Sequence, residues 1–140
     1  MQLRPPIIGL QVYTGVNDNE LTTSLAPPSW VTHTTLSIPA TNPGGRFLFW
    51  VSAEWSMDDE NNPNYGEFVL DGTTVLNRWV AAFKKKYDVA PLDYYYPLAG
   101  MHEQLGLSAG AHTLILRFAA GGGKVARMRH GHIYAWRIGD

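Results

Sequence analysis

The sequence contains no cysteine among its 140 residues. Disulfide bridges, thiolate metal ligands and a cysteine nucleophile are therefore excluded. Charged residues are also sparse, because Asp, Glu, Lys and Arg together make up 16% of the chain, against roughly 25% in a typical soluble domain. The formal net charge is −1, and no clustered basic surface of the kind that binds phosphates is evident, so we expect no nucleic-acid partner.

Long hydrophobic runs are absent as well. No apolar stretch approaches the roughly 20 residues that a membrane-spanning helix needs, so we expect no membrane partner. The segment MQLRPPIIGLQVY at residues 1–13 has neither the positively charged start nor the long apolar region of a secretory signal peptide. We therefore expect no export signal within the chain.

What the sequence does contain is alternation of apolar and polar residues, in runs rich in Val, Ile, Thr, Phe, Tyr and Trp. Side chains on a strand point to opposite faces in turn, so this pattern predicts half-buried strands along the chain. In the segment 30–38, one face carries Trp30, Leu36 and Ile38. In the segment 47–55, which is expected to be a central strand, one face carries Phe47, Phe49, Val51, Ala53 and Trp55.

Turns rich in glycine separate these runs. Asp71-Gly72 lies between two alternating segments and supplies the positive φ angles that a two-residue hairpin turn requires. Glycines at positions 121–123 permit a tight reversal, which predicts a hairpin formed by the last two strands. The segment 76–87 fits either a strand or a helical stripe, and we favour an extended strand that leads into a loop.

About eight strands are therefore expected, with long loops at residues 14–29, 56–66 and 84–98. No helical segments alternate with them as they would in an α/β fold. The prediction is an all-β, single-domain, antiparallel β-sandwich of jelly-roll type. Residues 1–13 are expected to form an extended N-terminal arm that leads into the first strand, and residues 14–140 the sandwich domain.

A possible metal site is the pair His130 and His132. Residues two apart on a strand point to the same face, so both rings could reach one metal ion if His102 or His112 joined them. The pair is in phase with Met128, Tyr134 and Trp136, which predicts that it forms part of the core-side wall of the sandwich. We therefore expect no metal and no cofactor. The opposite face of this last strand is predicted to carry Arg127, Arg129 and Arg137.

Other patterns that could carry chemistry are weak. No serine lies in a Gly-x-Ser-x-Gly turn, and no recognisable order joins a serine to a histidine and an acid. Asp58, Asp59 and Glu60 offer oxygen ligands for calcium but lack the EF-hand spacing, so a polar surface loop is favoured. The three consecutive lysines at residues 84–86 are interpreted as a solvated turn. We expect no catalytic residues, and the protein is not expected to be an enzyme.

Two groups of residues are candidates for contacts with other molecules. The first comprises aromatic rings in or beside loops, which can stack on sugars or anchor a protein interface, namely Trp79, Tyr94, Tyr95 and Tyr96. The second comprises candidates for assembly with neighbouring subunits. These are Leu3, Arg4, Pro5 and Pro6 in the arm, which two prolines keep from forming a helix, and Arg127 and Arg129 in the last strand.

Several segments together carry a resemblance to a known group of proteins. They are FLFWVSAEWSMDDENNPNYGEFVLDGTTV, then LSAGAHTLILRF, a glycine turn, and GHIYAWRI. In this order of a strand, an Asp-Gly hairpin, a strand entry and a closing strand, the chain from about Arg46 to Ile138 resembles the small jelly-roll virion proteins of tailed bacteriophages. That group includes capsid decoration proteins and tail or fibre accessory proteins.

The resemblance implies a non-enzymatic structural component of a virion, made in the host cytoplasm. It further implies a homo-oligomer, commonly a trimer, whose partner is a major capsid protein or a tail protein. Jelly-roll carbohydrate-binding modules share much of the same pattern. The alternative is therefore a carbohydrate- or receptor-binding module of a tail or fibre, with a glycan as its ligand.

Overall fold

The structure is a computed structural model that describes residues 11–57, 63–81 and 95–140. Predictions on other positions lie outside the described residues. They concern the arm residues Leu3, Arg4, Pro5 and Pro6, the acids Asp58, Asp59 and Glu60, the lysines at 84–86, and Tyr94.

The described part of the chain consists of nine strands and their connections. The strands are β1 (Val12–Asn17), β2 (Leu21–Thr23), β3 (Val31–Ile38), β4 (Gly45–Met57), β5 (Asn64–Leu70), β6 (Thr74–Ala81), β7 (Tyr96–Leu107), β8 (His112–Ala120) and β9 (Ala126–Gly139). Among residues 11–57, 63–81 and 95–140, no helix is long and apolar enough to cross a membrane.

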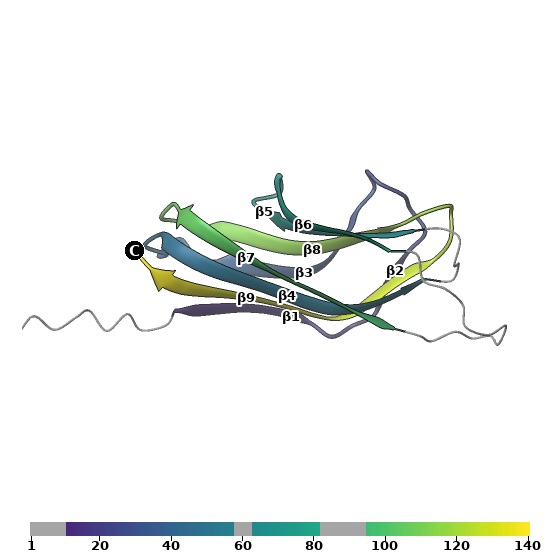
Figure 1. The fold of residues 1–140 in the computed structure, drawn as a ribbon, viewed down its shortest axis with the longest axis horizontal. Coiled ribbons are helices and arrows are strands. Elements are labelled where there is room, and N and C mark those ends of the chain that lie inside the picture. Colours follow the sequence, from purple (N-terminus) through teal and green to yellow (C-terminus); the bar gives the residue numbers. More distant parts are fainter. Residues whose placement is uncertain (1–10, 58–62, 82–94) are drawn as a thin grey trace, which may run out of the picture.

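The strands form two layers that run along the long axis of the molecule (Figure 1). One layer is a five-stranded sheet in the order β1-β9-β4-β7, in which β2 also pairs with β9. The other is a four-stranded sheet in the order β3-β8-β5-β6. All pairs are antiparallel. The prediction of an all-β, jelly-roll-like sandwich is confirmed.

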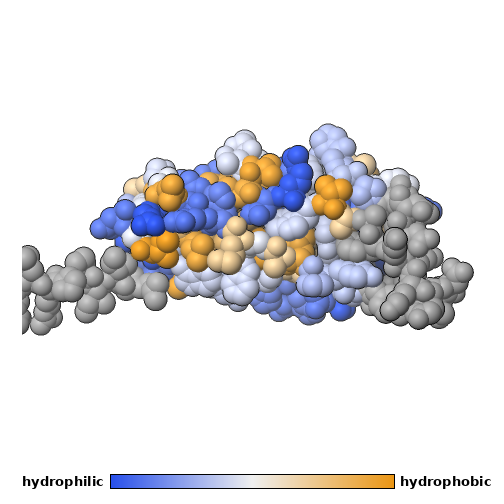
Figure 2. Space-filling model, in the orientation of Figure 1, coloured by the Kyte–Doolittle hydropathy of each residue, from blue (hydrophilic) through white to orange (hydrophobic). Residues whose placement is uncertain are grey.

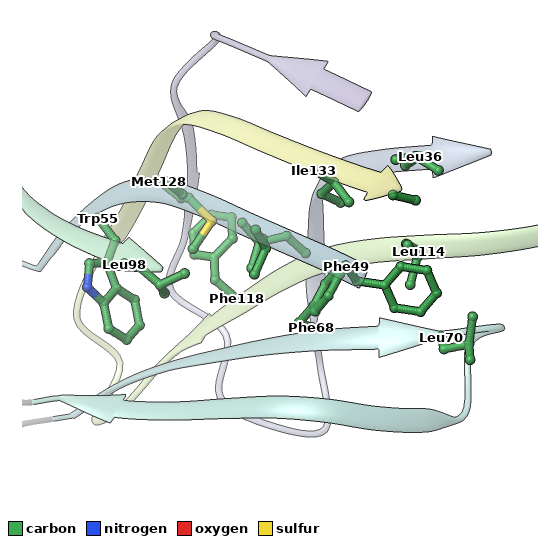
Figure 3. Packing of buried hydrophobic residues seen from close by; sticks show 14 of the residues in the cluster. Leu36, Phe49, Trp55, Phe68, Leu70, Leu98, Leu114, Phe118, Met128 and Ile133 are labelled. Carbon is green, nitrogen blue, oxygen red and sulfur yellow. The ribbon is translucent and has the colours of Figure 1, made fainter. Parts of the chain in front are cut away.

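The core lies between the two sheets (Figure 3). Phe47, Phe49 and Val51 point inward from β4 and are fully buried, as the alternation in segment 47–55 predicts. Phe49 meets Phe68 of β5 edge to face, with ring centroids 6.5 Å apart and an interplanar angle of 89°. Burial of each such side chain contributes about 1.5–3 kcal/mol, so these rings hold the two layers together.

The hairpin predicted at Asp71-Gly72 is confirmed, and it joins β5 to β6. Both residues have positive φ angles, 51° for Asp71 and 76° for Gly72. Because Leu70 pairs with Thr74, the loop contains one residue more than the predicted two. The described part of segment 76–87 continues β6 to Ala81, which supports the strand rather than the helix.

Two sequence predictions about the connections between strands are wrong. Residues 14–29, expected to be a loop, contain most of β1 and all of β2, and β1 already begins at Val12. The last two strands do not form a hairpin, because β8 pairs with β3 and β5 whereas β9 pairs with β1, β2 and β4. The glycine turn at 121–123 therefore carries the chain from one layer to the other. Alternation reports which face of a strand is buried, but not which strand lies beside it.

A β-bulge interrupts the pairing of β9 with β4. Ser52 pairs with His132 and Glu54 pairs with Arg129, so β9 has one residue more than β4 between these pairs. His130 lies in this stretch, and its φ of 51° is positive. An extra residue of this kind shifts the facing of every side chain that follows it.

The bulge reverses the predicted facing of the last strand. Met128, before the bulge, is fully buried, but after it the buried positions are odd-numbered, as Ile133 shows. His132, Tyr134 and Trp136 therefore lie on the outer face of the five-stranded sheet. The prediction that the histidine pair faces the core is wrong, because a period of two holds only while the pairing is unbroken.

A second bulge lies in β3. Thr32 pairs with Arg117 and Thr34 pairs with Leu116, so His33 is the additional residue. Leu36 and Ile38 are buried in the core as predicted. Trp30, before the bulge, does not share their face; its ring has the guanidinium of Arg117 4.9 Å from its centroid.

The two bulged regions face each other across the sandwich, where they come close together at Gly131. A Cβ atom added at Gly131 would lie 2.6 Å from His33 Nδ1 and still closer to Thr34 Oγ1. The His33 ring is held by Thr34 Oγ1 at 2.7 Å from Nδ1 and by the Asn19 carbonyl at 2.8 Å from Nε2. Because β3 and β9 approach each other so closely here, only glycine fits at position 131, between His130 and His132.

Candidate functional site

The outer face of the five-stranded sheet carries apolar side chains at its centre, where a solvated sheet face ordinarily carries polar ones. Trp50 of β4 pairs with Tyr134 of β9 on one side and with Met101 of β7 on the other. One row along, Leu48 pairs with Trp136. We call this surface the aromatic face; it consists of Val12, Val16, Leu48, Trp50, Met101, Tyr134 and Trp136.

The rings of the aromatic face stack on one another. Tyr134 and Trp136 are nearly parallel, with centroids 5.6 Å apart and an interplanar angle of 7°. Trp50 lies 5.7 Å from Tyr134 and 6.0 Å from Trp136, centroid to centroid. His132 extends the stack, 6.4 Å from Tyr134. Such mutual packing restricts the side-chain rotamers, so the surface is already ordered before any partner binds.

Much of this apolar surface remains open to solvent. The exposed fractions are 61% for Met101, 54% for Val16, 43% for Val12 and 39% for Trp50. Single exposed apolar residues are ordinary, but a contiguous group of them marks a surface that binds something. Figure 2 shows apolar residues reaching the surface between hydrophilic ones along the body of the molecule.

Ion pairs lie at both ends of the aromatic face. Arg46 and Glu103 pair at 2.9 Å, beside Leu48. Arg129 and Glu54 pair at 2.8 Å toward the other end of β4. An apolar centre bordered by polar groups is the usual anatomy of a protein–protein interface.

The assembly candidates of β9 lie near this surface. Arg129 pairs with Glu54, and its guanidinium carbon also lies 3.5 Å from the centroid of the Tyr95 ring. Arg127 is partly buried and makes an interaction of its own. Both precede the bulge, so they share the outer face with His132, and the prediction of opposite faces is wrong. Arg137 instead points toward the carbonyl of Gly44, which its Nε contacts at 2.6 Å.

The aromatic residues predicted to stack on ligands are not gathered into one site. Trp79 is partly buried against the core and lies over Gly100, where an added Cβ would come within 2.7 Å of its ring. Tyr95 has Arg129 against its ring. Tyr96 is 38% exposed at the start of β7 and has an interaction of its own.

His130 and His132 meet Asp18 rather than the other histidines. His130 Nδ1 lies 3.2 Å and His132 Nε2 3.5 Å from the same carboxylate oxygen of Asp18. His102 stacks on Phe49, with ring centroids 6.3 Å apart. In the part of the chain that the structure describes, no three His, Asp or Glu side chains are grouped so as to hold a metal ion.

An acid, a histidine and a serine are in contact in the order found in a catalytic triad, namely Asp71, His112 and Ser108. The geometry of their hydrogen bonds opposes that role. His112 Nδ1 lies 2.7 Å from Asp71 Oδ2, and Nε2 lies 2.8 Å from the Ser108 carbonyl oxygen and 3.2 Å from its hydroxyl. Nδ1 faces a carboxylate oxygen, and Nε2 lies closer to the Ser108 carbonyl oxygen than to its hydroxyl, so both nitrogens are placed to donate and the arrangement favours the protonated ring. A protonated histidine cannot take a proton from serine.

The pKa values of the pair agree with this arrangement. Desolvation alone would lower the pKa of His112, but the hydrogen bonds that its ring donates to the Asp71 carboxylate and the Ser108 carbonyl, together with the Asp71 charge, raise this pKa above 6.5. Desolvation likewise opposes the charge on Asp71, yet His112 and the Thr113 backbone N–H lower its pKa below 3.8. His112 therefore links the β5–β6 turn to the β7–β8 turn, through its ion pair with Asp71 and its hydrogen bond to the Ser108 carbonyl.

The sequence contained a signal for only part of the aromatic face. Trp50 alternates with Phe49 and Val51, so its outward position follows once those two are placed in the core. Tyr134 and Trp136 had no such signal, because the bulge at His130 reversed their facing.

No protein-family model and no curated protein sequence matches this chain. Among solved structures, the Eiger TNF protein of S. frugiperda is similar with a TM-score of 0.62 at 12% identity, and the match covers 94% of each chain. A structure of the Gt strain of infectious bursal disease virus has a TM-score of 0.46 at 10% identity, covering 96% of this chain and 37% of that one. The first likeness shows a shared jelly-roll fold.

Proposed function

We propose that the protein is a non-enzymatic structural component of a virion, a capsid decoration or cement protein, and that it assembles as a homo-oligomer through its aromatic face. The observation that carries the proposal is the stack formed by Trp50, Tyr134 and Trp136 on an exposed sheet. Large, ordered aromatic rings with a polar border are the groups that dominate the binding energy of protein interfaces.

A second copy of the chain is the partner that the charges favour. The ion pairs at the two ends of the aromatic face are each neutral within one chain, Arg46 with Glu103 and Arg129 with Glu54. The face therefore selects no partner of opposite charge, and two copies of it do not repel each other. In a closed trimer, each subunit would contact its two neighbours through two different parts of this face.

Sedimentation velocity tests the assembly. We expect the wild-type protein to sediment at a multiple of its 15.6 kDa chain mass, and Trp50→Glu to sediment as a monomer. The matched control is Val75→Glu, which places the same charge on a residue that is 39% exposed on β6, in the other sheet. A wild-type monomer at tens of micromolar protein, or an intact Trp50→Glu oligomer, would refute assembly through this face.

Cosedimentation with particles tests the virion role. The oligomer is expected to bind capsids or tails stripped of accessory proteins, with the major capsid protein or a tail protein as its partner. Shortening the arm by removing residues 1–6 is expected to weaken this binding. An oligomer that binds no particle would leave the assembly standing and remove the role as a virion component.

A second candidate function is recognition of a glycan or receptor. One observation favours it, a pocket of about 320 Å³ on the outer face of the four-stranded sheet, with two aromatic rings in its wall. This pocket and the aromatic face belong to different sheets, so both functions can operate in one assembly.

A further inference from the structure

The pocket lies where the outer face of β5 and β6 meets the loop before β3. Tyr65 of β5 and Val80 of β6 are cross-strand partners, and Arg78 lies two residues before Val80 on the same face. Pro27 and Trp30 of the loop complete the wall. The volume of about 320 Å³ is at the lower end of the range for small-molecule sites, enough for one sugar ring.

The loop that supplies Trp30 is held against the sheet. The Ala120 backbone N–H donates to the Leu25 carbonyl at 2.8 Å, and the Ser29 N–H donates to the Ala26 carbonyl at 2.9 Å. Arg117 of β8 lies 4.9 Å from the centroid of the Trp30 ring. The aromatic wall of the pocket is thus positioned before a ligand enters, which reduces the entropy lost on binding.

Beside the pocket, the charges do not balance. Glu67 is 1% exposed and accepts from two arginines, with Arg78 Nη2 2.6 Å from Oε2 and Arg117 Nη2 2.9 Å from Oε1. One carboxylate and two guanidinium groups leave one positive charge in excess. Arg78 carries this excess into the pocket wall, since its side chain is 62% exposed even though its Nε and Nη2 are bonded to Glu67.

We propose that this pocket binds a pyranose ring that bears a carboxylate, of the uronic or sialic acid type; the inference rests on the second candidate function. The apolar C–H face of a pyranose packs on flat rings such as Trp30 and Tyr65. A carboxylate on the same ring is attracted to Arg78, whose guanidinium Glu67 holds in place. A neutral sugar would gain the stacking but not the charge.

Ligand-observed NMR and calorimetry with three probes test the chemistry. The probes are glucuronate, glucose and benzoate, which separate the charged sugar from the ring alone and from a flat aromatic acid. We expect glucuronate to bind about tenfold more tightly than glucose, the effect of one charge-assisted contact, and more tightly than benzoate. Equal affinity for the two sugars, or tighter binding of benzoate, would overturn the assignment.

Two variants tie binding to the pocket. Val80→Trp is expected to fill the pocket and abolish glucuronate binding, and because Val80 is 59% exposed the fold should tolerate it. Arg78→Gln is expected to bring the affinity for glucuronate down to that for glucose. Val75→Ser, also on β6 but outside the pocket, is the control and should bind as the wild type does.

The outcomes separate this inference from the proposed functions. Glucuronate binding that Val80→Trp leaves unchanged would retain glycan recognition but remove it from this pocket. Absence of binding by all three probes would overturn the pocket assignment, while the sedimentation result for Trp50→Glu would stand unaffected.

Discussion

His112 and Asp71 form an ion pair that joins the β5–β6 turn to the first residue of β8, with Nδ1 and Oδ2 2.7 Å apart. Because the pKa of His112 is raised, its contribution to stability is complete below pH 6.5 and is lost as the pH rises through the raised value. Because the pKa of Asp71 is lowered, its contribution is present above pH 3.8 and is lost as the pH falls through the lowered value.

The pair is therefore expected to stabilise the fold most between these two values. A double-mutant cycle of Asp71→Asn and His112→Asn, measured by urea unfolding, should give a coupling energy of up to about 1 kcal/mol at pH 5.5, since the Asp71 carboxylate is partly solvated. At pH 9 the coupling should be smaller, because neutral His112 loses the ion pair but keeps the hydrogen bond from Nδ1–H to Asp71. A cycle on Arg46 and Glu103, an ion pair that contains no histidine, is the control. A His112 coupling that is equal at both pH values would contradict the ion pair.

The pKa of His33 is shifted in the opposite direction to that of His112. Burial is the main cause that lowers the pKa of His33 below 6.5, so its neutral form is favoured in the fold. Its contribution to stability is present above pH 6.5 and is lost as the pH falls through the lowered pKa. Titration of the imidazole C–H signals by NMR should show His33 with a midpoint below 6.5 and His112 with a midpoint above it. A His33 midpoint above 6.5 would refute the first assignment, and a His112 midpoint below 6.5 would refute the second.

Gly131→Ala is expected to destabilise the fold. The added Cβ would lie 2.6 Å from His33 Nδ1, so β3 and β9 must separate to admit it. Overpacking of this kind costs about 1–3 kcal/mol. Gly106→Ala is the matched control, because a Cβ at Gly106 meets nothing within 4 Å. Equal midpoints of urea unfolding for the two variants would show that the sheets do not approach as closely as described.

Glu67→Gln is expected to cost more stability than loss of either arginine. The buried carboxylate binds both guanidinium groups, so its removal leaves Arg78 and Arg117 close together without a counter-charge. Loss of Arg78 alone leaves Glu67 paired with Arg117. We expect a loss of about 2–3 kcal/mol for Glu67→Gln and a smaller one for Arg78→Ala, measured by urea unfolding. The reverse order would show that Glu67 does not hold the cluster.

The sequence by itself determined the strands and much of their facing. The alternation of Phe47, Phe49 and Val51 required one buried face, and in the same strand it turned Trp50 outward. Asp71-Gly72 determined the β5–β6 hairpin, because both residues tolerate the positive φ that the turn needs. These features depend on residues that are close in the chain, so they can be found without knowing which strands meet.

Only the tertiary structure decided which strands share a sheet and where their facing changes. The separation of β8 from β9 depends on pairing between distant segments, for which alternation carries no signal. The bulges at His33 and His130 add one residue each, so Trp30, Tyr134 and Trp136 turned to the outer surface against the local pattern. Both candidate sites lie beside these bulges because a shift of one residue moves a large aromatic ring from the core to the surface.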